Sequence, residues 1–193
     1  EPKEMKFGYR DSAIKKGKTG LITWIEIELM DLAGKARPLY SGQIAKDLNS
    51  EMGAQPTLKE VRASVLKLRA SKSMVLDPSD PNSVSCGSFF TNPIVSDTFA
   101  RTLPSDAPSW ETPEDDGLTV KLSAAWLIEQ SGIEKGFSLP GSSAAISQKH
   151  ALAITNRGGA TADQIVELAR YVQERVASKF GINLVPEPNL IGF

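Results

Sequence analysis

The sequence predicts an α+β protein made of two unequal domains, and three observations support this fold class. The chain has 193 residues, of which 40% are hydrophobic, which suits one large domain or two small ones. Segments with helical spacing and segments with strand spacing both occur along the chain. Asp, Pro, Ser and Asn dominate residues 77–85, a composition typical of a domain boundary.

The first predicted element is a strand over residues 21–30. Apolar and polar side chains alternate there, which is the period of a half-buried strand. Residues 31–38, which include Gly34, then form a predicted turn. The residues that share the predicted buried face of the strand are Leu21, Thr23, Ile25, Ile27 and Leu29.

An amphipathic helix is predicted from Thr57 to about Lys72. Thr57 and Glu60 have the spacing of a capping box, in which each side chain bonds the other residue's backbone amide. Apolar residues then recur at helical spacing. They are Leu58, Val61, Val65 and Leu68.

Four further elements are predicted in the second half of the chain. Residues 103–117 are rich in proline and acidic residues and should form a surface loop. Residues 121–130 are apolar on most sides and predict a short buried helix that stops at Gly132. Residues 144–155 should contribute strand. Thr161 begins a second capping box, which predicts a final helix ending at Gly181.

The charge balance excludes several classes of partner. Lys and Arg total 22 against 23 for Asp and Glu, so a net charge of -1 gives no long-range attraction to nucleic acid or anionic lipid. No apolar run approaches the roughly 20 residues that span a bilayer. We therefore expect a soluble protein with no membrane and no nucleic acid partner, and the single cysteine favours the cytoplasm.

Cysteine and histidine are too rare for the usual zinc sites. Cys86 and His150 are single in the chain, which excludes an internal disulfide and leaves no predicted metal site. We expect Cys86 to be a buried, inert thiol. The start of the chain resembles the middle of a domain, so we also expect a region upstream of it.

Several side chains are candidates for function, each with a structural alternative. Ser88 lies between Gly87 and two phenylalanines, where it either caps local backbone amides or takes part in chemistry. Glu187 lies between two prolines that fix its backbone, and it is either solvated or part of a site.

Arg10 could bind a carboxylate or pair with Asp11. Lys72 could bind phosphate or complement a helix dipole. His150 alone is more often structural than catalytic.

The order of four motifs along the chain is more specific than any of these signals. The motifs GSFFTNPIVS, KLSAAWLIEQSGIEKG, KHALAITN and FGINLVPEPNLIGF together resemble the UDP-N-acetylenolpyruvoylglucosamine reductases. The resemblance extends from Phe7 to Gly192, but the glycine-rich loops that hold FAD in that family have no counterpart here. It implies that residues 1–73 close a flavin-binding α/β domain, 74–180 form an α+β substrate-binding domain, and 181–193 return to the active site.

The same resemblance implies the roles of individual residues. Ser88 aligns with the family's proton donor, Glu187 with its active-site glutamate and Arg10 with its active-site arginine. Tyr40 resembles the tyrosine of a mobile loop that closes over the nucleotide. Lys72 and Asn92 resemble residues that contact the diphosphate. Further residues of the nucleotide-sugar pocket are implied to be Trp110, Lys121, Lys135, His150 and Leu152.

The implied reaction uses NADPH to reduce FAD, and hydride then passes to the double bond of UDP-N-acetylglucosamine enolpyruvate. We expect a monomer, and we expect this chain alone neither to retain FAD nor to turn over. Two alternatives stay open. One is a non-catalytic module that binds nucleotide sugars, and the other is a different flavoprotein oxidoreductase on a related scaffold.

Overall fold

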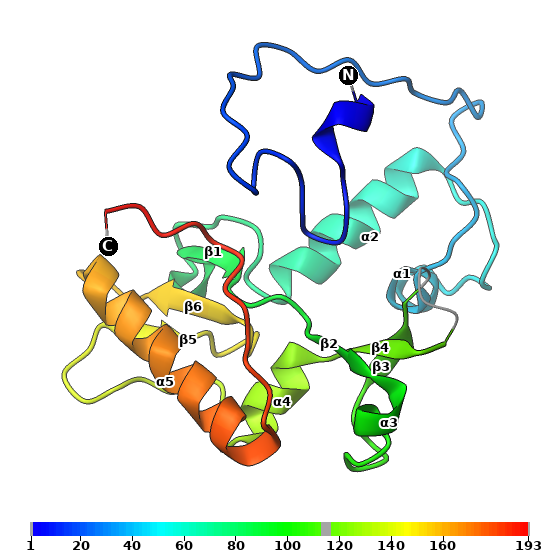
Figure 1. Ribbon diagram of the computed structural model, residues 1–193. Coiled ribbons are helices and arrows are strands. Elements are labelled where there is room, and N and C mark those ends of the chain that lie inside the picture. The colour runs from blue at the N-terminus through cyan, green and yellow to red at the C-terminus, as the bar shows by residue number, and fades with distance from the viewer. Residues whose placement is uncertain (1, 113–116, 193) are drawn as a thin grey trace. The chain divides into compact units, whose positions relative to one another are not determined.

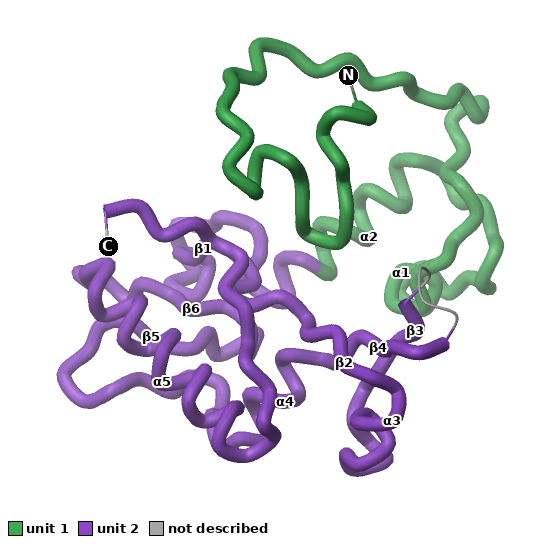
Figure 2. The backbone as a smooth tube through the Cα atoms, viewed as in Figure 1, with its two compact units in different colours: residues 1–68 green, residues 69–193 purple. Residues whose placement is uncertain are grey.

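Helix α2 (Leu58–Ala70) crosses the point at which the chain divides into two units, Glu1–Leu68 and Arg69–Phe193 (Figure 2). The computed structural model describes residues 2–112 and 117–192. Helices and antiparallel sheets both occur, so the predicted α+β class is confirmed.

Unit 1 contains the short helices η1 (Pro2–Met5) and α1 (Gly42–Asp47) and most of α2. The predicted strand over residues 21–30 is wrong, because this segment has no regular structure and all of it is exposed. Leu21 and Leu29 are 87% and 85% exposed. A strand requires a neighbour to bond its backbone, and the described residues of unit 1 form no strand that could pair with it.

The capping box that begins α2 is confirmed. The backbone amide of Thr57 donates to Glu60 Oε2 at 2.8 Å, and the amide of Glu60 donates to Thr57 Oγ1 at 3.2 Å. An ion pair of 2.6 Å between Lys67 Nζ and Asp47 Oδ1 joins α2 to α1. The helix ends at Ala70, close to the predicted end.

The larger sheet of unit 2 has the order β1-β6-β5 and is antiparallel (Figure 1). Its strands are β1 (Ser85–Ser88), β5 (Ala144–Ile146) and β6 (Ala153–Asn156), so the predicted strand region 144–155 is confirmed as a hairpin. Helices α4 (Ala124–Gln130) and α5 (Ala162–Phe180) contact each other, and α5 also contacts β5 and β6. The apolar side chains between these elements form the core. They include Phe89, Phe90, Leu127, Ile128, Ile146, Leu168, Val172 and Val176.

A smaller antiparallel sheet has the order β2-β4-β3. It consists of β2 (Ile94–Ser96), β3 (Ser109–Glu111) and β4 (Thr119–Leu122), with α3 (Asp97–Ala100) directly after β2. The predicted surface loop 103–117 is therefore wrong in part, because β3 lies within it; residues 113–116 lie outside the described part of the chain.

The two helices predicted in the second half of the chain are found. The first begins later than predicted, because β4 continues to Leu122 and Ser123 caps α4 by accepting from the amide of Trp126. The prediction for α5 is confirmed at both ends. The Thr161 and Gln164 capping box is complete, and Gly181 ends the helix with a φ of 68°.

Candidate active site

The backbone of Phe89 is hydrogen-bonded on both sides to segments that carry predicted site residues. Its amide donates to the carbonyl oxygen of Leu152 at 2.8 Å, and its carbonyl oxygen accepts from the amide of Glu187 at 2.8 Å. Ser88, the preceding residue, pairs with Ala153 across β1 and β6. The structure therefore brings Ser88, Leu152 and Glu187 to one place.

A bulge in β1 sets the position of Ser88. The register between β1 and β6 shifts between Ser85 and Ser88, and Gly87 has a φ of 83°. Residues other than glycine rarely adopt such a φ, so glycine suits this position. Bulges re-aim the side chains beside them. Ser88 is thus partly buried at the end of a bulged strand.

Two phenylalanines form the apolar wall beside Ser88. Phe89 and Phe90 are each 2% exposed, and their rings meet edge to face with centroids 5.2 Å apart. Such a wall excludes water, and electrostatic interactions are stronger where water is excluded. Ser88 therefore lies between solvent and an apolar interior.

The segment after α5 brings Glu187 back to the sheet. Ile182 and Leu184 are buried and anchor the segment, and Gln173 Nε2 donates to the carbonyl oxygen of Leu184 at 2.7 Å. The chain then runs antiparallel to residues 89–91, with an isolated bridge between Phe90 and Pro186 (Figure 1). Glu187 is only partly exposed, so it is not a freely solvated side chain.

Cys86 reports on the charge of Glu187. Loss of solvent and then the negative charge of Glu187 raise the pKa of the Cys86 thiol above its ordinary value. The Glu187 carboxylate is thus within electrostatic reach of Cys86, so its charge disfavours the thiolate. The prediction that Cys86 is buried is wrong, because the residue is exposed. Cys86 lies within β1, before the side chains of Phe89 and Phe90 enter the core.

Two lysines from separate segments of unit 2 lie within electrostatic reach of His150. Burial and then the positive charges of Lys72 and Lys135 lower the pKa of His150. Lys72 follows α2, Lys135 follows α4, and His150 lies in the loop between β5 and β6. Lys135 Nζ lies 3.3 Å from Glu129 Oε1. This basic cluster, defined as Lys72, Lys135 and His150, is chemically suited to an anionic ligand.

The smaller sheet places another pair of predicted residues side by side. Trp110 in β3 and Lys121 in β4 are direct cross-strand partners, and Trp110 is 48% exposed. Asn92 lies just before β2, where its Oδ1 accepts from the amide of Ala124 at 3.0 Å. The side-chain oxygen of Asn92 thus helps to cap α4. The side-chain amide nitrogen is left to donate to a phosphate oxygen.

Arg10 and Tyr40 belong to unit 1. Arg10 is exposed in the turn between Gly8 and Asp11 and has a φ of 52°. Tyr40 is 82% exposed and precedes Ser41, which caps α1. Their convergence with Ser88 stays a prediction, since each unit is described by itself.

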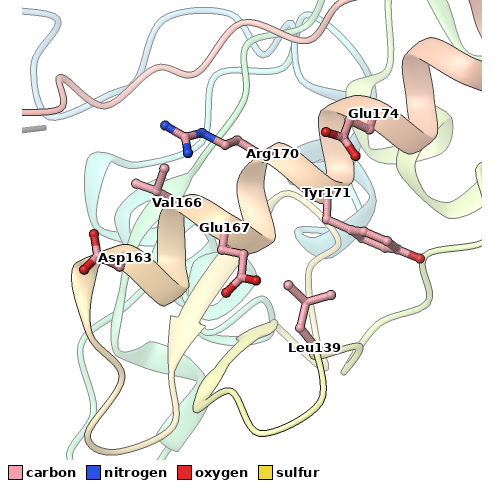
Figure 3. Close-up of a pocket in the computed structure, with 7 residues that line it drawn as sticks. All are labelled: Leu139, Asp163, Val166, Glu167, Arg170, Tyr171 and Glu174. Carbon is pink, nitrogen blue, oxygen red and sulfur yellow. The ribbon is translucent and has the colours of Figure 1, made fainter.

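A hollow on α5 holds none of the predicted residues (Figure 3). Acidic side chains and Arg170 line it together with apolar groups, so it shows no single chemical character. The residues that line it are Leu139, Asp163, Val166, Glu167, Arg170, Tyr171 and Glu174. We therefore place the candidate site at Phe89 and the basic cluster.

The described residues show neither a metal-binding group nor a membrane-spanning helix. No group of three or more His, Cys, Asp and Glu side chains there could bind a metal ion. No helix in residues 2–112 or 117–192 is long and apolar enough to cross a membrane.

Sequence comparisons find relatives over nearly the whole chain. The profile of the UDP-N-acetylenolpyruvoylglucosamine reductase C-terminal domain matches residues 78–191. A UDP-N-acetylenolpyruvoylglucosamine reductase from Leifsonia xyli is 48% identical over 98% of this chain and 58% of its own length. Relatives of the same name from Mycolicibacterium gilvum and Mycobacterium tuberculosis are 44% and 43% identical, over 99% and 98% of this chain.

The chain spans about half the length of these curated relatives, 54% in the two mycobacterial proteins. The matched region contains the bulged strand, the basic cluster apart from Lys72, and the returning segment with Glu187. From the match to residues 78–191 and the identity over nearly the whole chain, the protein belongs to the UDP-N-acetylenolpyruvoylglucosamine reductase family.

Proposed function

We propose that this chain supplies the proton donor and the substrate-binding part of an oxidoreductase that makes UDP-N-acetylmuramate for peptidoglycan. The substrate would be UDP-N-acetylglucosamine enolpyruvate, with FAD and NADPH as the redox cofactors and the bacterial cytoplasm as the place of reaction. The observation that carries the proposal is the double hydrogen bonding of Phe89, which brings Leu152 and Glu187 to Ser88.

The hydroxyl of Ser88 would protonate the substrate. Bound flavin, once reduced by NADPH, would supply hydride to one carbon of the enolpyruvyl double bond, and negative charge would then develop on the neighbouring carbon and the substrate carboxylate. Ser88 would deliver a proton to that neighbouring carbon and recover one from solvent through a relay, since a lone hydroxyl is a weak acid at neutral pH. The apolar wall of Phe89 and Phe90 would limit competing access by water.

Glu187 and Arg10 would act on the substrate carboxylate. A guanidinium binds a carboxylate with two parallel hydrogen bonds and stabilises charge that grows in the transition state. Two adjacent carboxylates cannot both stay ionised cheaply, so Glu187 would be protonated or would orient a donor when substrate is bound. Its position close to Cys86 and the bulge supports the assignment.

The remaining predicted residues would bind the nucleotide. The basic cluster of Lys72, Lys135 and His150 would attract the diphosphate, with the amide nitrogen of Asn92 as a further donor. Trp110 and Lys121, paired across the smaller sheet, would hold another part of the nucleotide sugar, and Leu152 would line the pocket beside Ser88. Tyr40 would close over the nucleotide.

The test is Ser88→Ala in the complete protein, followed by stopped-flow absorbance of both half-reactions. We expect reduction of the enolpyruvyl nucleotide to slow by about 10²–10⁴-fold, the usual effect of removing a general acid. Flavin reduction by NADPH should change little. Equal losses in both half-reactions would contradict the role of Ser88. A wild-type protein that binds the nucleotide without NADPH-dependent turnover would instead favour a non-catalytic binding module.

A further inference from the structure

The carboxylate of Asp80 joins three segments of unit 2. Its Oδ2 accepts from Ser73 Oγ at 2.6 Å and from Lys149 Nζ at 2.9 Å. Its Oδ1 accepts from the backbone amide of Asn82 at 3.0 Å. The side chain of Asp80 is only 16% exposed, and charge-assisted bonds of this kind are the stronger hydrogen bonds in proteins.

One arm of this network fixes the end of α2. Ser73 is 3% exposed and has a φ of 56°. Residues other than glycine rarely adopt this backbone conformation. Such strained residues persist where the surroundings hold them. Because Lys72 is the preceding residue, the bond from Ser73 to Asp80 also fixes the direction in which Lys72 leaves the helix.

The other arm fixes the loop between β5 and β6. The backbone amide of Gln148 donates to Asn82 Oδ1 at 2.9 Å, and Lys149 bonds Asp80 directly. Both residues immediately precede His150. Asp80 therefore lies at the junction between the segment that carries Lys72 and the loop that carries His150.

Lys72 and His150 need such a support. Each is cationic or can become so, and Lys72 is close enough to disfavour the charged form of His150. An anion between the two side chains is bound best when both are already in place. The hydrogen bonds of Ser73 and Lys149 keep the pKa of Asp80 well below its usual range, so the network stays intact at neutral pH.

We infer that Asp80 is a positioning residue for the substrate diphosphate, which holds Lys72 and His150 as a preformed anion-binding pair without contacting the ligand. The inference rests on the proposed function, because it takes the basic cluster as the diphosphate site. Asp80 acts only through Ser73, Lys149 and the Asn82–Gln148 link.

The test compares Asp80→Asn with Asp77→Asn in the complete protein. The first variant keeps an acceptor for Asn82 but places an amide group where Ser73 and Lys149 donate. The second removes a charge from the same turn, where Asp77 Oδ1 accepts hydrogen bonds from Ser79 and its charge acts on Lys149 through space rather than through a hydrogen bond. We expect Asp80→Asn to raise KM for the enolpyruvyl nucleotide about tenfold with kcat nearly unchanged. Asp77→Asn should match the wild type.

A binding measurement separates positioning from general damage to the fold. Calorimetry with UDP and with uridine should show that Asp80→Asn lowers the ratio of UDP to uridine affinity about tenfold, since only UDP carries the diphosphate. Unchanged KM and an unchanged ratio would overturn the inference, as would equal effects of the two variants.

If Asp80→Asn does not fold, Lys149→Met is measured in the same assays. A lowered ratio of UDP to uridine affinity supports the inference, and a wild-type ratio overturns it. A wild-type protein that neither binds UDP nor turns over would refute the proposed function itself, and the inference with it.

Discussion

The backbone amide of Glu187 donates to the carbonyl oxygen of Phe89 at 2.8 Å, next to the bulge that holds Ser88. This bond fixes the returning segment in register with residues 89–91, together with the bond from Thr91 to the carbonyl oxygen of Val185 at 3.0 Å. The backbone of Glu187, near the end of the chain, is thereby held beside that of Phe89, the residue after Ser88.

The first prediction concerns the charge of Glu187. Because that charge raises the pKa of Cys86, Glu187→Gln should lower the pKa and increase the reactive thiolate at a given pH. Alkylation of Cys86 by iodoacetamide, followed by mass spectrometry across pH, should therefore be faster in the variant. Glu174→Gln, an exposed change on α5, is the control and should leave the rate unaltered. Identical rates in both variants would place Glu187 away from the bulge.

The second prediction concerns the bulge. Gly87→Ala should lower the free energy of unfolding by about 1–2 kcal/mol, because an alanine at a φ of 83° is strained although its Cβ meets no atom within 4 Å. Gly42→Ala is the matched control. It has no positive φ and lies at the start of α1, so it should be neutral or stabilising by up to about 1 kcal/mol. Urea unfolding measures both, and equal stabilities would refute the strain argument.

The third prediction concerns the anchor of the returning segment. Leu184 is 1% exposed, so Leu184→Ala should cost about 2–5 kcal/mol of unfolding free energy through lost burial and a cavity. Leu190→Ala, on the same segment but 47% exposed, should change stability by less than about 0.5 kcal/mol. Chemical denaturation checks both changes. A small loss for Leu184→Ala would mean that the segment is not anchored in the core.

The fourth prediction concerns the titration of His150. Its folded-state pKa lies below the ordinary value of 6.5 because of burial and then Lys72 and Lys135. The unfolded chain therefore takes up this proton first as pH falls, so His150 lowers stability as pH falls below about 6.5. Proton NMR of the imidazole should show a higher pKa in Lys72→Met, and a higher pKa again when UDP binds. A pKa that UDP leaves unchanged would separate His150 from the anion site.

Elements with local signals at both ends could be predicted from the sequence. Thr161 and Gln164 mark the start of α5, and Gly181 marks its end, so the prediction needs no tertiary information. Helix α4 was predicted with the wrong start, because Lys121 and Leu122 continue the apolar pattern but belong to β4. Short apolar runs do not distinguish strand from helix.

Elements that depend on distant partners could not be predicted in the same way. Apolar and polar side chains alternate over residues 21–30 as in a strand, yet this segment is irregular. Alternation can place apolar side chains on one face, but it does not supply a neighbouring strand to bond the backbone. Strand β3 was missed for the opposite reason, since its pairing with β4 stabilises a segment with weak propensity. The closeness of Ser88 and Glu187 was expected only from family resemblance. No spacing rule joins two segments so far apart in sequence.

The hydrogen bonds of Phe89 have a consequence for how this region tolerates change over evolution. Both bonds come from the main chain, so every residue type except proline can make them at this position. Neighbouring side chains can therefore diversify while the scaffold that aligns hydroxyl and carboxyl stays constant. Insertions or deletions of one residue between positions 185 and 188 would be far more damaging than substitutions, because they would shift the alignment of the two chains.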